Sequence, residues 1–128
     1  MTLTDLYRFA DTKSIYIYSI ELEDNISISI PSKNKYYIAI DVDKIETNIE
    51  EKECLAHELG HCETGSFYNI YSKLDIRAKH ENRADKWAIK KLIPQDELKE
   101  AINCGYIELW ELAEYFEVTY ELMEKAII

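Results

Sequence analysis

The chain has 128 residues, of which 47% are hydrophobic, and its 25 acidic and 15 basic side chains give a formal net charge of −10. A chain of this length and composition predicts one compact domain, residues 1–128, that needs neither disulfides nor a metal merely to fold. Its negative charge repels polyanions, so we expect no direct nucleic-acid binding. No run is long enough to span a bilayer, so we expect no membrane partner.

The N-terminal segment and the cysteines favour the cytoplasm. Met1–Asp11 carries charged side chains and lacks the apolar core of a signal peptide. The chain has an odd number of cysteines, and no two of them form a CxxC pair: Cys54, Cys62 and Cys104. Such cysteine usage fits a reducing compartment better than a secreted disulfide framework.

The first third of the chain has strand character after a short expected helix over Thr4–Lys13. The strand-like runs are Ser14–Ile20, Asn25–Ile30 and Tyr36–Asp41. Isoleucine and serine alternate with a period of two in the second run, which predicts a half-buried strand. Pro31 ends this run and Ser32–Lys35 supplies a turn. Short links between the runs predict an antiparallel meander.

From Thr47 onward the pattern is helical. Thr47 is a suitable N-cap for a helix over Ile49–Glu63, and Gly65 is a suitable stop. A loop over Ser66–Tyr71 follows. Later helices are expected at Ile76–Lys91, Gln95–Asn103, Ile107–Phe116 and Thr119–Ile127. Strands followed by helices predict an α+β fold, with a small three-stranded antiparallel sheet packed on a mainly helical C-terminal part.

The strongest functional signal is an HExxH motif, HELGH at His57–His61, inside the first long helix. Side chains four residues apart share one helical face, so both imidazoles can bind one ion. Imidazole nitrogen is a good ligand for zinc, and we predict Zn²⁺ as the cofactor. Glu58 lies one residue round the helix, beside the ion, where a catalytic base can take a proton from activated water. Chance would give this motif in roughly one chain of this composition in a hundred.

A catalytic zinc site needs a third protein ligand and one position for water. The next helix offers Glu81 and Asp85, which are four residues apart and share a face. We predict that Glu81 binds the metal and that Asp85 holds His57 through its remaining N–H. Two alternatives stay open: Asp85 binds the metal instead, or both acids are ordinary surface residues.

A family resemblance rests on three segments, namely HELGH at His57–His61, ENRADKWA at Glu81–Ala88 and KLIP at Lys91–Pro94. Together they resemble the ImmA/IrrE family of zinc metallopeptidases. Asp85 stands where that family usually has asparagine, and Trp87 stands where phenylalanine is usual. The aspartate also brings the chain close to the gluzincin pattern HExxH…ExxxD, in which this position supports a metal ligand.

The resemblance implies a hydrolase in which Glu58 acts first as base and then as acid toward the leaving amine. The carbonyl oxygen then needs a further hydrogen-bond donor as negative charge develops. Tyr68, Tyr71 and His80 are the candidates for this transition-state stabiliser. His80 is adjacent to Glu81 and so points about 100° away on an ideal helix, which argues against it.

The implied substrate is a helix-turn-helix repressor of a phage or mobile element. An edge strand, for which Tyr36–Asp41 is the candidate, can pair with an extended substrate segment. The alternative is a non-proteolytic anti-repressor, a binding module that sequesters a regulator and retains the metal for structure. A weaker option is a toxin-like or stress-response factor.

Two further features carry weaker signals. Cys54 lies on the metal face but about 10 Å of helical rise from His61, so one ion cannot readily bind both histidines and this cysteine. The acidic tail, Leu109–Ile127, can dock a protein partner. Its large apolar side chains are expected to pack against the helices that carry the motif: Trp110, Leu112, Tyr115, Phe116 and Leu122.

Overall fold

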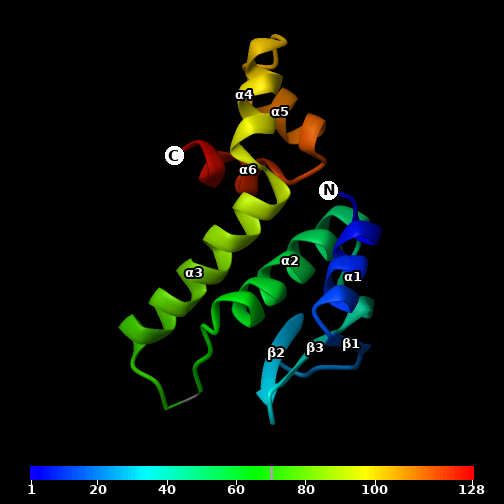
Figure 1. The fold of residues 1–128 in the computed structure, drawn as a ribbon, viewed down its shortest axis with the longest axis vertical. Coiled ribbons are helices and arrows are strands. Elements are labelled where there is room, and N and C mark those ends of the chain that lie inside the picture. Colours follow the sequence, from blue (N-terminus) through cyan, green and yellow to red (C-terminus); the bar gives the residue numbers. More distant parts are fainter. Residues whose placement is uncertain (70) are drawn as a thin grey trace.

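The computed structural model describes residues 1–69 and 71–128, and it has the expected α+β architecture (Figure 1). In chain order the elements are α1 (Leu3–Thr12), β1 (Ile15–Ser19), β2 (Ser27–Ser32), β3 (Lys35–Ile40), the 3₁₀ helix η1 (Val42–Lys44), α2 (Asn48–Thr64), α3 (Leu74–Leu92), α4 (Gln95–Asn103), α5 (Leu109–Phe116) and α6 (Tyr120–Ile127). Of the loop predicted at Ser66–Tyr71, position 70 lies outside the described residues. None of the described helices combines the length and apolarity that crossing a bilayer requires.

The sheet is mixed, and the predicted antiparallel meander is wrong. The strand order is β1-β3-β2, with β1 parallel and β2 antiparallel to the central strand β3. Strands β2 and β3 form a hairpin, through a turn in which Lys33 and Asn34 both have positive φ, as a type I′ turn requires. The link from β1 to β2 is longer, covering residues 20–26, so it leaves a place for β3 between them. Tyr36–Asp41 is therefore the central strand rather than an edge.

The isoleucines of β2 face outward. Ser29 lies opposite Ile38, whose side chain is fully buried, and residues directly opposite each other in a ladder share a face of the sheet. Ser27 and Ser29 therefore face the helices, whereas Ile26 and Ile30 are each 46% exposed. The alternation correctly predicts a strand, but the polar face of that strand is the one turned inward.

Local capping chemistry sets the ends of the helices close to where the sequence places them. The Thr47 side chain accepts the backbone N–H of Glu50, and Gly65 ends α2 in the left-handed conformation. Helix α1 begins one residue earlier than predicted, because the Thr2 and Asp5 side chains form a reciprocal capping box. The caps at Thr47 and Gly65 fix the limits of the helix that carries the HExxH motif.

The C-terminal helices pack on the core through one face only. Leu112 and Phe116 are buried, and Leu122 packs against the core from a partly buried position. Trp110 and Tyr115, by contrast, are 57% and 48% exposed. The prediction that these two aromatic side chains pack against the helices of the motif is therefore wrong.

Helices α2 and α3 approach each other so closely that residue 60 has no room for a side chain. A Cβ atom built on Gly60 would lie 2.5 Å from the carbonyl oxygen of Ala84, well inside van der Waals contact. Because the obstructing atom belongs to the backbone, it cannot rotate away. The absence of a side chain at Gly60 lets the turn that carries the two histidines lie against the segment of α3 that carries Glu81.

We expect Gly60→Ala to destabilise the fold by about 1–3 kcal/mol, as overpacking does, and to weaken metal binding. In an open helical position the same change stabilises by roughly 0.5–1 kcal/mol, so the sign of the effect is diagnostic. Urea unfolding measures it. Glu63→Ala, on the same helix, is the control and should shift stability by less than about 0.5 kcal/mol. A Gly60→Ala protein as stable as the parent contradicts the close approach.

Candidate metal centre

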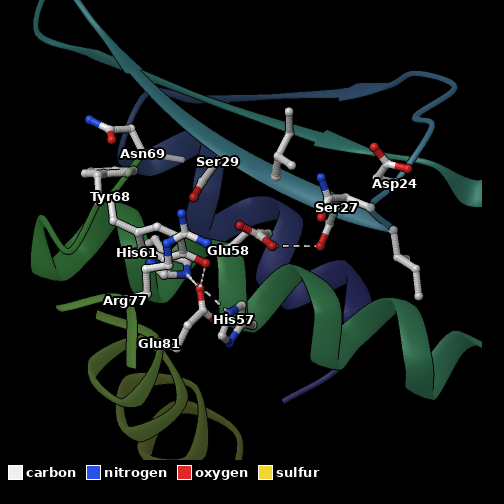
Figure 2. A pocket seen from close by; sticks show the side chains of 14 residues that line it. Asp24, Ser27, Ser29, His57, Glu58, His61, Tyr68, Asn69, Arg77 and Glu81 are labelled. Atoms are coloured by element: carbon white, nitrogen blue, oxygen red, sulfur yellow. Dashed lines mark hydrogen bonds and ion pairs between the residues drawn. The ribbon is translucent and has the colours of Figure 1, made fainter. Parts of the chain in front are cut away.

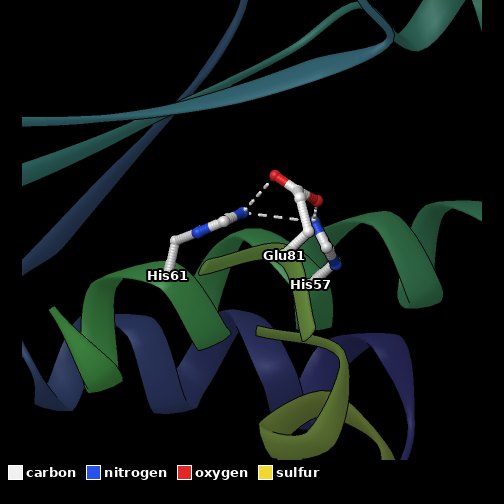
Figure 3. A group of neighbouring side chains, drawn as sticks. All are labelled: His57, His61 and Glu81. Carbon is white, nitrogen blue, oxygen red and sulfur yellow. Dashed lines mark hydrogen bonds and ion pairs between the residues drawn. The ribbon is translucent and has the colours of Figure 1, made fainter. Parts of the chain in front are cut away.

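Three side chains from α2 and α3 converge on a common point (Figure 3). The Nε2 atom of His57 lies 2.8 Å from Oε2 of Glu81, and the Nε2 atom of His61 lies 3.1 Å from Oε1 of the same carboxylate. The two Nε2 atoms are 3.2 Å apart. One ligand atom from each of the three residues lies within 4.8 Å of the others, so a single ion can contact all three.

The outer nitrogens of both imidazoles are held by groups that can only accept a hydrogen bond. Nδ1 of His57 lies 2.8 Å from Oδ1 of Asp85, and Nδ1 of His61 lies 2.5 Å from the carbonyl oxygen of Ser66. Nδ1 of each ring therefore donates a hydrogen, which leaves Nε2 as the atom that each ring directs toward the centre and can offer to an ion. Two lone pairs and a carboxylate in one small space repel one another unless a cation lies between them. The donor set fits a metal ion.

Asp85 lies in the position expected of a supporting residue. Burial alone would lower the pKa of His57, but the hydrogen bond to Asp85 and the negative charges of Glu58 and Glu81 outweigh it and raise the pKa. The same hydrogen bond lowers the pKa of Asp85. The carboxylate thus fixes the ring orientation and makes the imidazole more basic, as outer partners of metal-binding histidines commonly do. Neither Glu81 nor Asp85 is a free surface acid.

Glu58 lies beside this centre at the wall of an open cavity of about 660 Å³ (Figure 2). Its side chain is buried, and its Oε2 atom accepts a hydrogen bond of 2.7 Å from the hydroxyl of Ser27 on β2. The serine face of β2 and the histidine face of α2 line the same cavity. We call His57, His61 and Glu81 the metal group. A carboxylate that is held in place beside this group, and is accessible from an open cavity, is suitably placed to take a proton from water.

Of the three predicted transition-state stabilisers, the structure brings only Tyr68 to the cavity. Its hydroxyl donates to Oε1 of Glu81 at 2.7 Å, and this bond raises the pKa of Tyr68 to about 12, so the hydroxyl keeps its proton. Tyr71 is 89% exposed, and it is not among the described residues that line the cavity. His80 stacks on the Tyr68 ring, with centroids 6.3 Å apart, and it too is not among the described residues that line the cavity.

Ser27 and Arg77 line the cavity but lie outside the predicted set of site residues. Ser27 is 31 positions from Glu58, and no local pattern connects them. Arg77 lines the cavity, lies over the Tyr68 ring at 5.9 Å and donates from Nε to the carbonyl oxygen of Ser72. It stands four residues before Glu81, on the same face of α3, and this spacing is the signal that could have found it.

Comparison with known proteins agrees with this geometry. The family model described as the IrrE N-terminal-like domain, a family of peptidases, matches residues 10–127. The chain belongs to this family. No curated protein and no solved structure matches it. Family membership together with the His57, His61 and Glu81 group makes this a metallopeptidase-family protein with a group of side chains able to bind a metal.

Substituting each carboxylate in turn distinguishes the proposed metal ligand, Glu81, from the residue that supports His57, Asp85. We expect Glu81→Ala to weaken zinc affinity by more than about 100-fold, and Asp85→Ala by about 10–100-fold, because the latter removes only an outer partner. Competition with a chromophoric chelator measures both. Asp75→Ala, an exposed acid on the first turn of α3, should leave the affinity unchanged. A larger loss for Asp85→Ala than for Glu81→Ala would reverse the assignment.

Proposed function

We propose that the protein is a cytoplasmic, zinc-dependent endopeptidase. The observation that carries this proposal is the convergence of His57, His61 and Glu81 beside an open cavity in which Glu58 is held by Ser27. Three protein ligands with a further position left for water distinguish catalytic zinc sites from structural ones, which are closed by four ligands. Family membership supports a peptidase reaction.

The chain's own residues account for the proton transfers. His57, His61 and Glu81 would hold a zinc ion, which would supply the Lewis acid that activates water and polarises the scissile carbonyl. Glu58 accepts the proton from water and later donates it to the leaving amine. The hydrogen bond from Ser27 orients the carboxylate and leaves Oε1 to accept that proton. The Tyr68 hydroxyl, protonated and close to the centre, serves as the donor to the developing oxyanion.

The free edge of β2 offers a backbone template for an extended substrate. The N–H of Asp41 donates to the carbonyl of Ile26 at 2.8 Å, and pairs in an antiparallel ladder alternate between bonded and non-bonded. Ser27 and Ser29 therefore direct their backbone groups away from β3, along the cavity. Pro31, which has no N–H, falls at another outward-facing position. A peptide that adds to this edge lies across the metal group, as strand addition allows.

We take the substrate to be a helix-turn-helix repressor of a phage or mobile element. Two observations support this choice: membership of the IrrE N-terminal-like family, and a net charge of −10, which complements the basic surface of a DNA-binding protein. Cleavage would then release the genes that the repressor controls. A non-proteolytic anti-repressor would bind the same partner without needing Glu58, so one substitution separates the two functions.

That substitution is Glu58→Gln, which removes the base but keeps the side-chain volume. We expect zinc affinity and partner binding to be retained and the cleavage rate to fall by at least about 10²–10⁴, the usual contribution of a general acid–base group. Intact mass of a co-expressed regulator reports the fragments. Derepression that persists unchanged in the Glu58→Gln protein would instead favour sequestration.

Tyr68→Phe tests the oxyanion donor without altering the aromatic packing on His80. We expect kcat to fall by about 10²–10³, as on removal of a single oxyanion-hole donor, while zinc stays bound. Single-turnover cleavage, with zinc content measured on the same sample, is the readout. Tyr71→Phe, a matched change at an exposed position, is the control. Equal rates for the two variants would exclude Tyr68 from the reaction.

A further inference from the structure

A second concave surface lies at the opposite end of the molecule from the sheet, on α5 and the turn before it (Figure 1). The surface contains an open cavity of about 430 Å³, which is lined by Tyr106, Trp110, Glu111, Glu114 and Tyr115. We name these five residues the aromatic–acidic surface. A cavity of this volume is large enough for one or two side chains of a partner.

The surface follows from the amphipathic character of α5. Leu112, Ala113 and Phe116 are buried, whereas Trp110, Glu114 and Tyr115 are exposed to solvent. Trp110 and Glu114 are four residues apart, so they share a face of the helix. The rings of Tyr106 and Tyr115 lie 4.9 Å apart, and both line the cavity. Aromatic rings thus stand beside carboxylates in a concave arrangement.

The charge at this surface is uncompensated. Residues 101–124 contain six glutamates and no lysine, arginine or histidine. Among the ion pairs that the described residues form, none involves Glu111 or Glu114. Carboxylates next to the faces of tryptophan and tyrosine attract a cation twice, through charge and through the ring quadrupole. Arginine suits such a site best, because its planar guanidinium stacks on rings and pairs with carboxylates.

We propose that the aromatic–acidic surface binds a basic, arginine-containing segment of a partner protein. A nucleic acid or an anionic membrane would be repelled by the glutamates. A second copy of this chain also carries a net charge of −10, so self-association meets the same repulsion. Tryptophan and tyrosine are the residue types that most often dominate protein interfaces. A cationic protein segment is the occupant that satisfies all of these features.

Naming the partner as the substrate rests on the proposed function. A DNA-binding regulator is rich in basic residues, and one such segment held at α5 would raise the local concentration of its scissile segment at the metal cavity. Specificity would then come from docking at a distance from the cleaved bond. Short peptides without the basic segment would be poor substrates.

The test uses the full chain loaded with zinc, in a Glu58→Gln background so that hydrolysis plays no part. A fluorescent peptide of alternating arginine and glycine is titrated, with a glutamate–glycine peptide as its opposite, and anisotropy gives Kd. We expect binding of the arginine peptide alone, weakened by salt. Trp110→Ala should raise Kd about tenfold, whereas Tyr18→Ala, an exposed aromatic on the sheet, should not change it.

A charge-matched pair of variants excludes a mere effect of net charge. Glu111→Gln with Glu114→Gln should raise Kd at least about fivefold, and Glu121→Gln with Glu124→Gln, on α6, less than about twofold. Equal effects of the two pairs overturn the proposal, as does binding that Trp110→Ala leaves unchanged. A dimer seen by sedimentation and dispersed by Trp110→Ala overturns it in favour of self-association.

The outcome is separable from that of the proposed function. If the protein binds the arginine peptide at this surface but yields no fragments of any regulator, the docking proposal is supported and the proposed peptidase function is contradicted. If the protein fails to bind the peptide and cleaves a regulator at a rate that Trp110→Ala does not change, the peptidase function is supported and the docking proposal is contradicted.

Discussion

The metal group depends on one backbone contact, the approach of Gly60 to Ala84. Two helices of ordinary residues pack with their axes about 8–10 Å apart, the distance depending on the side chains at the contact. A residue without Cβ lets α2 lie directly against the backbone of α3. The motif contributes Gly60 in the same turn as His57 and His61, so the closest approach occurs where the third ligand must arrive. Packing and chemistry are therefore specified by the same five-residue segment.

The close packing of the two helices is favourable, but the polar groups that it brings together repel one another, because lone pairs and negative charges lie close to each other. The acceptors behind each imidazole, Asp85 and the Ser66 carbonyl, fix the tautomers that expose Nε2. The hydrogen bond from Tyr68 to Glu81 partly offsets this concentration of negative charge, and the hydrogen bond to Asp85 together with the neighbouring carboxylates raises the pKa of His57. A proton and a metal ion would compete for the same imidazole, and three converging ligands would favour the metal.

How much of this could be predicted from sequence depends on how local the determining interactions are. The capped helix over His57–His61 follows from residues within a few positions of each other, and so does the i, i+4 pair on α3. Strand order does not: the turn over Ser32–Lys35 is local and predictable, but the pairing of β1 with β3 is non-local. The Ser27–Glu58 bond also joins distant positions. The Ser66 carbonyl is a backbone group, which residue type does not reveal. The helical pattern of the tail shows that one face is buried, but Trp110 and Tyr115 stand beside glutamates on the other.

Polar contacts connect the C-terminal helices to the helices that carry His57, His61 and Glu81. Glu53 on α2 accepts both the backbone N–H and the hydroxyl of Thr119, and the buried Lys52 donates to the last carbonyl of α5, that of Phe116. Lys125 on α6 lies 3.9 Å from Asp85. The α5–α6 junction is thus fixed to the residues just before the HExxH motif. A partner held on the outer face of α5 would consequently have a defined orientation relative to the metal group, and such rigidity would let a surface far from the cavity select what enters it.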